Sequence, residues 1–78
     1  MREFPSLKAN QFLRKLTSEP LNYRITRSKG SHMILKSKGR GDIIFSWHGK
    51  VEIPGFRIRK VLIESAGLSE EQAWQVIH

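Results

Sequence analysis

Histidine is the side chain of this sequence best suited to chemistry, because its imidazole titrates near neutral pH without a perturbing environment. The sequence holds three histidines: His32, His48 and His78. His78 is the last residue and is set aside, because chain ends fray. An imidazole beside lysine and arginine can move a proton at a phosphodiester while the cations stabilise the charge that develops there. RNA supplies its own nucleophile, the 2′-hydroxyl group, so this chemistry needs neither a metal nor a protein nucleophile.

Other uses of these histidines fit the sequence less well. Asp42 and Glu52 are the acidic residues of the same stretch, and with two histidines and no cysteine they make a thin ligand set for a metal. A Ser-His-Asp triad is disfavoured because nothing indicates a nucleophile elbow or an oxyanion hole. A histidine at the end of a strand is also common as an exposed bystander. We therefore predict no metal and no cofactor. The role of the histidines is inferred from the charged residues near them in the sequence.

Basic charge is concentrated in the middle of the chain. Lysine and arginine number 14 against 7 acidic residues, a net charge of +7. Residues 24–60 hold ten basic residues and two acidic ones, a net of +8, whereas residues 61–78 carry a net of −3. Such a field favours a polyanion, most often nucleic acid, although a charged surface can also serve solubility alone. The side chains predicted to bind RNA phosphates are Lys29, Lys36, Lys38, Arg40, Arg57, Arg59 and Lys60.

Length and composition limit the class of protein. The chain has 78 residues, so we expect one small domain over residues 1–78. Hydrophobic residues make up 38%, which is enough for a modest core, and the absence of cysteine excludes a disulfide framework. No apolar run approaches the roughly 18 residues needed to span a bilayer, and no signal peptide opens the chain. We expect a cytoplasmic protein with no membrane partner.

Helical periodicity marks both ends of the chain. Apolar residues at positions 9, 12, 13 and 16 form one stripe, with Ser6 predicted as the cap and Pro20 as the stop. A second helix is predicted over residues 56–66, ended by Gly67 in the left-handed conformation. Ser69 and Gln72 form a capping box that starts a short last helix.

Alternation with a period of two predicts three strands between these helices. The first follows Asn22 and ends at Ser28-Lys29-Gly30, and the other two cover residues 32–37 and 42–47, with a glycine-rich turn between them. A loop over residues 38–41 sets His32 opposite Trp47, and brings His32 and His48 to the same open edge. That register puts Ile34 on one face with Ile43, Phe45 and Trp47, and Met33, Leu35 and Ile44 on the other; a slip of one residue would exchange the faces.

The order of these elements predicts an α+β fold, α-β-β-β-α with a small additional helix. The strands form a three-stranded antiparallel sheet with the helices on one face. Both faces of the predicted sheet are apolar, and one layer of helices cannot cover both. We therefore expect the second face to meet a protein partner.

The sequence also resembles HicA-type toxins, the small ribonucleases of bacterial toxin–antitoxin pairs. Three segments carry the resemblance: Gly30-Ser31-His32 between the first two strands, His48-Gly49-Lys50 after the third, and Ser65-Ala66-Gly67-Leu68-Ser69 at the end of the second helix. Together with the order of elements, they cover nearly the whole chain.

The resemblance implies a fold like the double-stranded-RNA-binding domain and a metal-independent endoribonuclease that cleaves mRNA. It also implies a type II toxin that is monomeric alone and is neutralised in a hetero-oligomer with a HicB-type antitoxin. The catalytic histidine of the family corresponds to His32, with Ser31 and His48 as possible auxiliary residues. The chain departs from the family where Ser46-Trp47 replaces a usual proline before the second histidine, and where Gly55-Phe56-Arg57 replaces Gly-Thr-Leu.

Two functions from other classes stay open. A non-catalytic double-stranded-RNA-binding module needs the same basic surface and reads the shape of A-form RNA. A protein-binding adaptor needs no RNA affinity, but accounts for the basic middle of the chain only if its partner is acidic.

Overall fold

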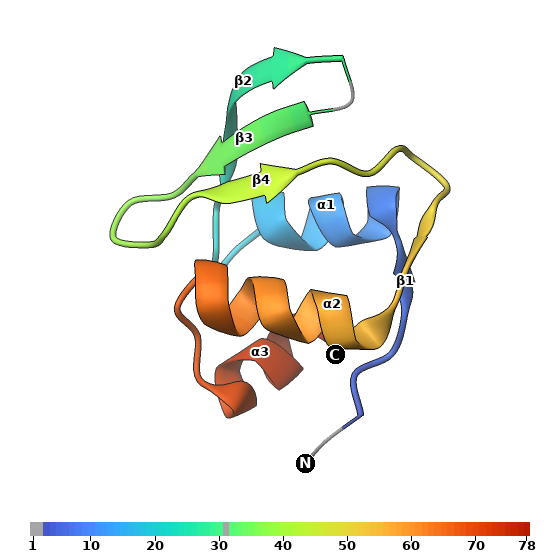
Figure 1. Cartoon of the computed structure of the whole chain (residues 1–78). Coiled ribbons are helices and arrows are strands. Elements are labelled where there is room, and N and C mark those ends of the chain that lie inside the picture. Colours follow the sequence, from blue (N-terminus) through green and yellow to red (C-terminus); the bar gives the residue numbers. More distant parts are fainter. Residues whose placement is uncertain (1–2, 31) are drawn as a thin grey trace.

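The computed structural model describes residues 3–30 and 32–78, and these form an α+β fold whose sheet lies on one side and whose helices lie on the other (Figure 1). In the described part of the chain, β2, β3 and β4 form a three-stranded antiparallel sheet with β3 in the centre. This confirms the predicted class and the antiparallel sheet. The elements are β1 (Leu7–Lys8), α1 (Ala9–Thr17), β2 (Arg24–Lys29), β3 (His32–Lys36), β4 (Ile43–Phe45), β5 (Glu52–Ile53), α2 (Gly55–Lys60), the π-helical turn η1 (Val61–Ser65) and α3 (Glu70–Ile77).

The register between β3 and β4 differs by one residue from the predicted one. Met33 pairs with Phe45, and Leu35 with Ile43, so these four side chains share one face. Phe45, Ile43 and Leu35 are at most 1% exposed, which makes this face the buried one. Because side chains alternate along a strand, the slip moves Ile34 and Ile44 to the opposite face. The predicted faces were therefore wrong.

A close approach at the turn between these strands accompanies this register. A Cβ atom added to Gly41 would lie 2.1 Å from the carbonyl oxygen of Ser65, so the backbone of residue 41 packs directly on the end of η1. The hydroxyl of Tyr23 donates a hydrogen bond to the Gly41 carbonyl at 2.7 Å. Gly41 is thus fixed by η1 and by Tyr23. Five residues separate Lys36 from Asp42, so the connection is one residue longer than the predicted loop.

The core lies between the sheet and the helices. Phe12 and Leu16 of α1 are fully buried, as are Ile58 of α2 and Leu62 of η1. The rings of Phe12 and Phe45 lie 6.2 Å apart and join α1 to the sheet. Truncating one such side chain to alanine costs about 2–5 kcal/mol in typical cores, so the apolar stripes predicted from the sequence account for much of the fold.

The start of α1 differs from the prediction. The helix begins at Ala9 instead of next to Ser6, whose hydroxyl donates to the carboxylate of Glu52 at 3.1 Å. The first two amide groups of α1 donate to the carbonyls of Val51 and Gly49, both at 2.8 Å. A distant loop therefore satisfies the amides that a capping side chain usually satisfies. The same region pairs β1 with β5 in a short sheet that the periodicity did not predict.

The end of the second predicted helix is as expected. α2 and η1 are continuous over residues 55–65, and Gly67 has a φ of 79°, the left-handed conformation. The Leu68 amide donates to the carbonyl of Leu62, which closes the helix. The capping box of α3 is also confirmed, since the Gln72 amide donates to the Ser69 hydroxyl at 3.1 Å. None of the helices in the described residues is long and apolar enough to cross a membrane.

Candidate nucleic-acid interface

The outer face of the β2–β3–β4 sheet, called the sheet face below, carries His32, Lys29 and Lys36 of the predicted site. It is the face opposite the buried side chains of Leu35 and Phe45, so it is assigned by the alternation along each strand. The side chains that the register places on it are Arg24, Arg27, Lys29, His32, Ile34, Lys36, Asp42 and Ile44.

His32 opens β3 on the sheet face and is exposed. Its partner across the hairpin is Lys29, and directly opposed residues of an antiparallel pair have Cβ atoms about 4.5–5.5 Å apart. Gly30, in the turn between them, has a φ of 60°, a conformation that glycine adopts without steric cost. The pairing therefore places the Cβ atoms of His32 and Lys29 side by side at the rim of the sheet.

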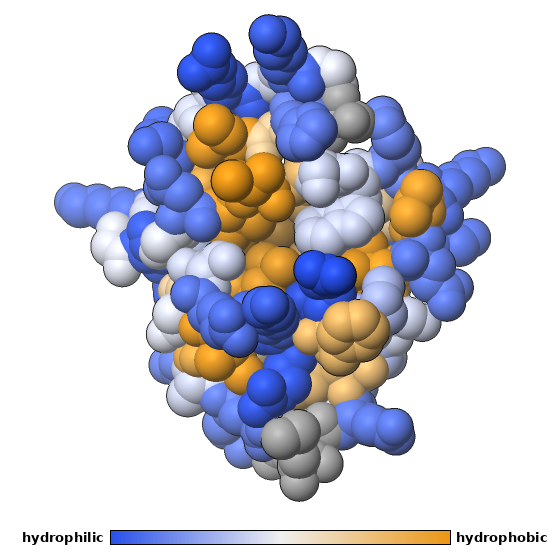
Figure 2. Space-filling view, in the orientation of Figure 1, coloured by the Kyte–Doolittle hydropathy of each residue, from blue (hydrophilic) through white to orange (hydrophobic). Residues whose placement is uncertain are grey.

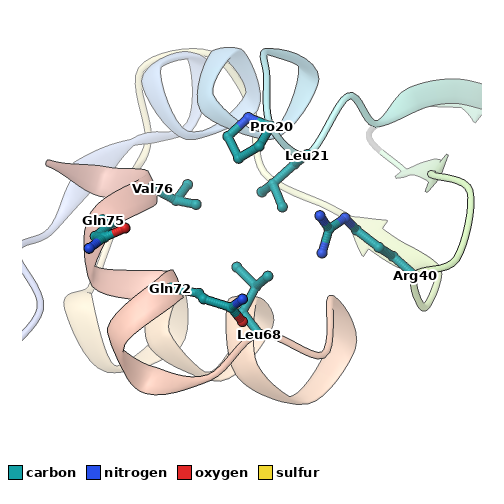
Figure 3. Close-up of a pocket in the computed structure, with 7 residues that line it drawn as sticks. All are labelled: Pro20, Leu21, Arg40, Leu68, Gln72, Gln75 and Val76. Atoms are coloured by element: carbon teal, nitrogen blue, oxygen red, sulfur yellow. The ribbon is translucent and has the colours of Figure 1, made fainter.

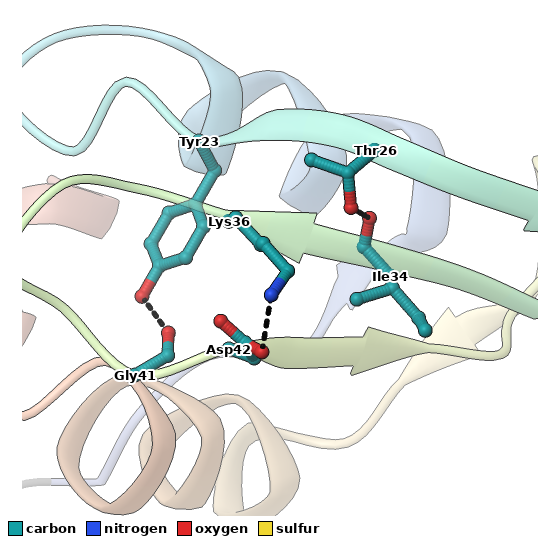
Figure 4. A network of polar contacts seen from close by, with 6 residues as sticks. All are labelled: Tyr23, Thr26, Ile34, Lys36, Gly41 and Asp42. Carbon is teal, nitrogen blue, oxygen red and sulfur yellow. Dashed lines mark hydrogen bonds and ion pairs between the residues drawn. The ribbon is translucent and has the colours of Figure 1, made fainter.

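A β-bulge in β2 decides which side chains accompany His32. The register shifts between Ile25 and Arg27, so Arg27 pairs with Ile34 and Lys29 with His32. In a strand without the bulge, both cations would face the core side. The hydroxyl of Thr26, the extra residue, donates to the carbonyl of Ile34 at 3.1 Å and ties the bulge to β3 (Figure 4). The prediction missed Arg27 as a site residue, because bulges leave no reliable signal in a sequence pattern.

An apolar centre lies within the ring of cations. Ile34 is half-buried and its partner Ile44 is 66% exposed. In Figure 2, hydrophobic atoms gather over the strands and hydrophilic side chains surround them. This face therefore offers apolar contact in the middle and positive charge around it.

The charge on the sheet face is partly neutralised at one place. The ammonium group of Lys36 lies 3.2 Å from the carboxylate of Asp42, and both side chains are more than half exposed (Figure 4). An exposed ion pair of this kind contributes little to stability. It does lower the positive charge that Lys36 presents, so Lys36 is a weaker phosphate ligand than Lys29.

A groove runs along the free edge of β4, and is called the edge groove here. It has a volume of about 260 Å³ and lies between β4 and the α2–η1 helix. Arg57 and Lys60 line it, together with Ile44 and the half-buried indole of Trp47. Next to it, Phe56 is 69% exposed and the guanidinium of Arg57 lies 5.6 Å from its ring centre. Two cations, the exposed ring of Phe56 and the half-buried ring of Trp47 suit the backbone and the bases of a single strand.

Arg59 points away from this groove, although it was predicted with Arg57 and Lys60. Its guanidinium donates to the carboxylate of Glu70 at 2.9 Å and so ties α2 to the first turn of α3. Its Nε is buried and has no hydrogen-bond partner in the described part of the chain. The ion pair leaves Arg59 the least free of the predicted cations.

Lys38 and Arg40 lie at the other end of the sheet from His32. Both belong to the connection between β3 and β4, and Arg40 is half-buried. The two line a groove together with Arg24. The predicted cations thus form separate groups, at the two ends of the sheet and along the edge groove.

His48 is exposed and follows β4 in the segment that caps α1. β3 begins at the end of the sheet where β4 finishes, so both histidines lie at that end, as predicted (Figure 1). Ser31 lies outside the described residues. His78 packs on Trp74, with ring centres 4.2 Å apart, on the helical side of the molecule.

No group of three or more His, Asp or Glu side chains that could hold a metal ion occurs over residues 3–30 and 32–78. Comparisons of the chain with protein-family models, with curated proteins and with solved structures find no match.

Proposed function

We propose that this protein is a metal-independent endoribonuclease of the HicA type, the toxin of a type II toxin–antitoxin pair, with a fold similar to the double-stranded-RNA-binding domain. The observation that carries the proposal is the position of His32. Its imidazole is exposed on the sheet face, opposite Lys29 and on the same side as Arg27. The proposal also rests on the resemblance of the Gly30-Ser31-His32 and His48-Gly49-Lys50 segments to this family.

The proposed reaction is attack of an RNA 2′-hydroxyl on the adjacent phosphorus. The bond from the 2′ oxygen to phosphorus forms as the bond from phosphorus to the 5′ oxygen breaks. His32 acts as the general base that takes the 2′ proton, or as the general acid that protonates the leaving 5′ oxygen, and solvent water exchanges the other proton. The products are a 2′,3′-cyclic phosphate and a 5′-hydroxyl end. Lys29 and Arg27 stabilise the charge that builds on the phosphoryl oxygens.

Substrate binding is assigned to the remaining free cations. Arg57 and Lys60 contact phosphates along the edge groove, and Phe56 and Trp47 offer rings for stacking bases. Phosphate contacts give affinity without sequence information, so cleavage preference has to come from the stacked bases.

The antitoxin partner follows from the same surface. A HicB-type antitoxin would cover His32, offer carboxylates to the surrounding cations and bury the apolar pair Ile34 and Ile44. The toxin acts in the cytoplasm, where its mRNA substrate lies. It is a monomer alone and a hetero-oligomer with the antitoxin.

The experiment is cleavage of single-stranded RNA in EDTA by the parental chain and by His32→Ala. His32 is exposed, so the substitution leaves the fold intact, while a positioned acid–base group is typically worth about 10²–10⁴-fold in rate. We expect that loss with unchanged salt-dependent RNA binding. His78→Ala is the matched control, because it removes an exposed imidazole on the helical side and should keep the parental rate.

Cleavage by His32→Ala at the parental rate contradicts the catalytic assignment. Absence of products from the parental chain, with binding to duplex RNA retained, favours the double-stranded-RNA-binding module instead. His48→Ala decides the auxiliary role, since a bystander leaves the rate unchanged.

A further inference from the structure

Two grooves meet at the end of the sheet opposite His32. The first, called the turn groove, has a volume of about 290 Å³ and lies beside the β3–β4 connection. The second, called the helix groove, has a volume of about 410 Å³ and lies beside α3. Both are lined by Pro20, Leu21 and Arg40, so they form one continuous depression with Arg40 between its halves.

The turn groove has the composition of an anion site. Arg24 of β2 lines it together with Lys38 and Arg40 of the β3–β4 connection. Asn22 and Ser37 complete its polar wall. No acidic side chain lines the groove, so three positive charges face one small volume without a counter-ion from the described residues.

The helix groove has a different composition. Leu68 and Val76 give it apolar walls, and the amide side chains of Gln72 and Gln75 stand at its rim (Figure 3). The Gln72 side-chain oxygen accepts a hydrogen bond from the Ser69 amide, which leaves its NH₂ group as a donor. Apolar walls with amides at the edge suit a flat heteroaromatic ring, which needs stacking surface and a few hydrogen bonds.

Arg40 connects the two halves. In Figure 3 its guanidinium points into the depression, toward the side chains of Leu21 and Gln72. Across residues 3–30 and 32–78 the guanidinium makes no hydrogen bond or ion pair, although it is half-buried. A planar guanidinium left free at this point can bind a phosphate with two donors.

We propose that this depression is a nucleotide subsite, with a phosphate in the turn groove and the attached base in the helix groove. The proposal rests on the ribonuclease function above and names a second contact for the same RNA strand. β3 spans about 13 Å from His32 to Lys36, at roughly 3.3 Å per residue. A stacked strand rises about 3.4 Å per nucleotide, so the subsite holds a nucleotide about four steps from the scissile phosphate.

An acidic peptide is the competing ligand, because it also complements three cations. A peptide carboxylate fills the turn groove alone and makes no use of the apolar walls beside it. A nucleotide fills both halves. Its phosphate and base are joined through one sugar, and the two grooves adjoin at the single side chain of Arg40. The observations therefore favour the nucleotide.

The binding experiment uses the full chain with His32→Ala, so that no substrate is consumed. Amide resonances are followed by NMR as adenosine, cytidine, guanosine and uridine monophosphates are added, with inorganic phosphate, the free nucleosides and a tetra-aspartate peptide as further probes. We expect shifts in residues 20–24, 37–40 and 68–76 with at least one monophosphate, and affinity above that for phosphate or the nucleoside. Equal affinity for phosphate alone, or tighter binding of the peptide, would overturn the proposal.

Arg40→Gln should weaken nucleotide binding about tenfold or more, because the variant loses hydrogen bonds between the guanidinium and a charged phosphate. Arg14→Gln is the matched control, because it removes an exposed arginine on α1 and should leave the affinity unchanged. Arg40 lies near Tyr23, so its substitution could also lower the stability of the fold. The urea midpoint of each variant measures that stability, and Arg40→Lys keeps the positive charge while it removes the planar guanidinium. Unchanged affinity in a folded Arg40→Gln variant contradicts the subsite.

Cleavage kinetics distinguish this proposal from the one on which it rests. With the parental His32, Arg40→Gln should raise KM for an RNA of eight nucleotides and leave kcat/KM for a dinucleotide unchanged. If neither RNA is cleaved by the parental chain, the ribonuclease function fails, while the NMR result still stands. If cleavage occurs and Arg40→Gln affects both RNAs equally, the subsite fails and the ribonuclease function stands.

Discussion

Tyr23 is a residue whose surroundings change the chemistry of its side chain. Its ring is 2% exposed and its hydroxyl donates to the Gly41 carbonyl. Burial raises the pKa of this hydroxyl above its ordinary value of 10.0; Arg40 opposes the rise and Asp42 adds to it. Tyr23 thus joins the start of β2 to the turn between β3 and β4, and does so in its neutral form.

A dependence of stability on alkaline pH follows for Tyr23. The folded state binds the phenolic proton more tightly than the unfolded state, so stability falls as pH rises through 10 toward the raised folded pKa. Tyr23→Phe removes the hydrogen bond to Gly41 and should lower the free energy of unfolding by about 1 kcal/mol at pH 7. This difference from the parental chain should be smaller near pH 10.5. Urea unfolding of the parental protein and of Tyr23→Phe at both pH values measures this difference in the free energy of unfolding. Both proteins have the same lysines, so the titration of lysine cancels in the comparison. A deficit that stays constant with pH would show that Tyr23 does not titrate differently in the two states.

At the scale of elements, the entry of α2 depends on Gly55. A Cβ atom at this position would lie 1.7 Å from the carbonyl oxygen of Phe4, so the start of α2 rests on the backbone of the N-terminal segment. This contact sets where α2 begins, and α2 carries the Arg57 and Lys60 side chains of the edge groove.

Gly55→Ala should therefore destabilise the fold by about 1–3 kcal/mol, the usual cost of overpacking, because two backbones must separate. Gly49→Ala is the matched control, since nothing lies within 4 Å of the Cβ that it adds. Thermal unfolding of the two variants gives the comparison. If Gly55→Ala is as stable as Gly49→Ala, the backbone at Phe4 can move away from residue 55 with no loss in the free energy of unfolding.

At the scale of the whole molecule, cations outnumber the acidic residues Asp42 and Glu64 over the sheet face, the edge groove and the turn groove. If RNA binds there as proposed, the logarithm of its affinity should fall with the logarithm of salt concentration at a slope of about −0.7 per phosphate contact. Lys60→Gln should lower the slope by about one such contact, and Arg14→Gln should leave it unchanged. Fluorescence anisotropy of a labelled single strand with His32→Ala at several salt concentrations tests both variants. Equal slopes for parental chain and Lys60→Gln would remove the edge groove from the interface.

Patterns of local sequence predicted the elements of this fold well. The apolar stripe of α1, the left-handed Gly67 and the Ser69 capping box all depend on neighbours within a few residues, so the sequence displays them directly. The antiparallel sheet and its order followed from alternation and short turns.

What escaped prediction depends on contacts between distant residues. The β3–β4 register depends on how the turn at Gly41 packs against Ser65, and the start of α1 on the carbonyls of Gly49 and Val51. The candidate site followed the same division. The sequence predicts His32 and Lys29 as site residues, and the structure pairs them across the β2–β3 hairpin. The face on which Arg27 lies depends on a bulge, and the ion pair of Arg59 with Glu70 joins elements distant in the sequence pattern.

The Lys36–Asp42 ion pair affects how the protein would bind a long nucleic-acid strand. Together with the apolar pair Ile34 and Ile44, it leaves the sheet face without net charge between the cations beside His32 and those of the turn groove. A polyanion that touches both ends gains from bivalent attachment, because the second contact forms at high effective concentration once the first is made. If RNA is cleaved beside His32 as proposed, each fragment would keep only one of the two attachments, so both fragments would dissociate faster than the intact strand.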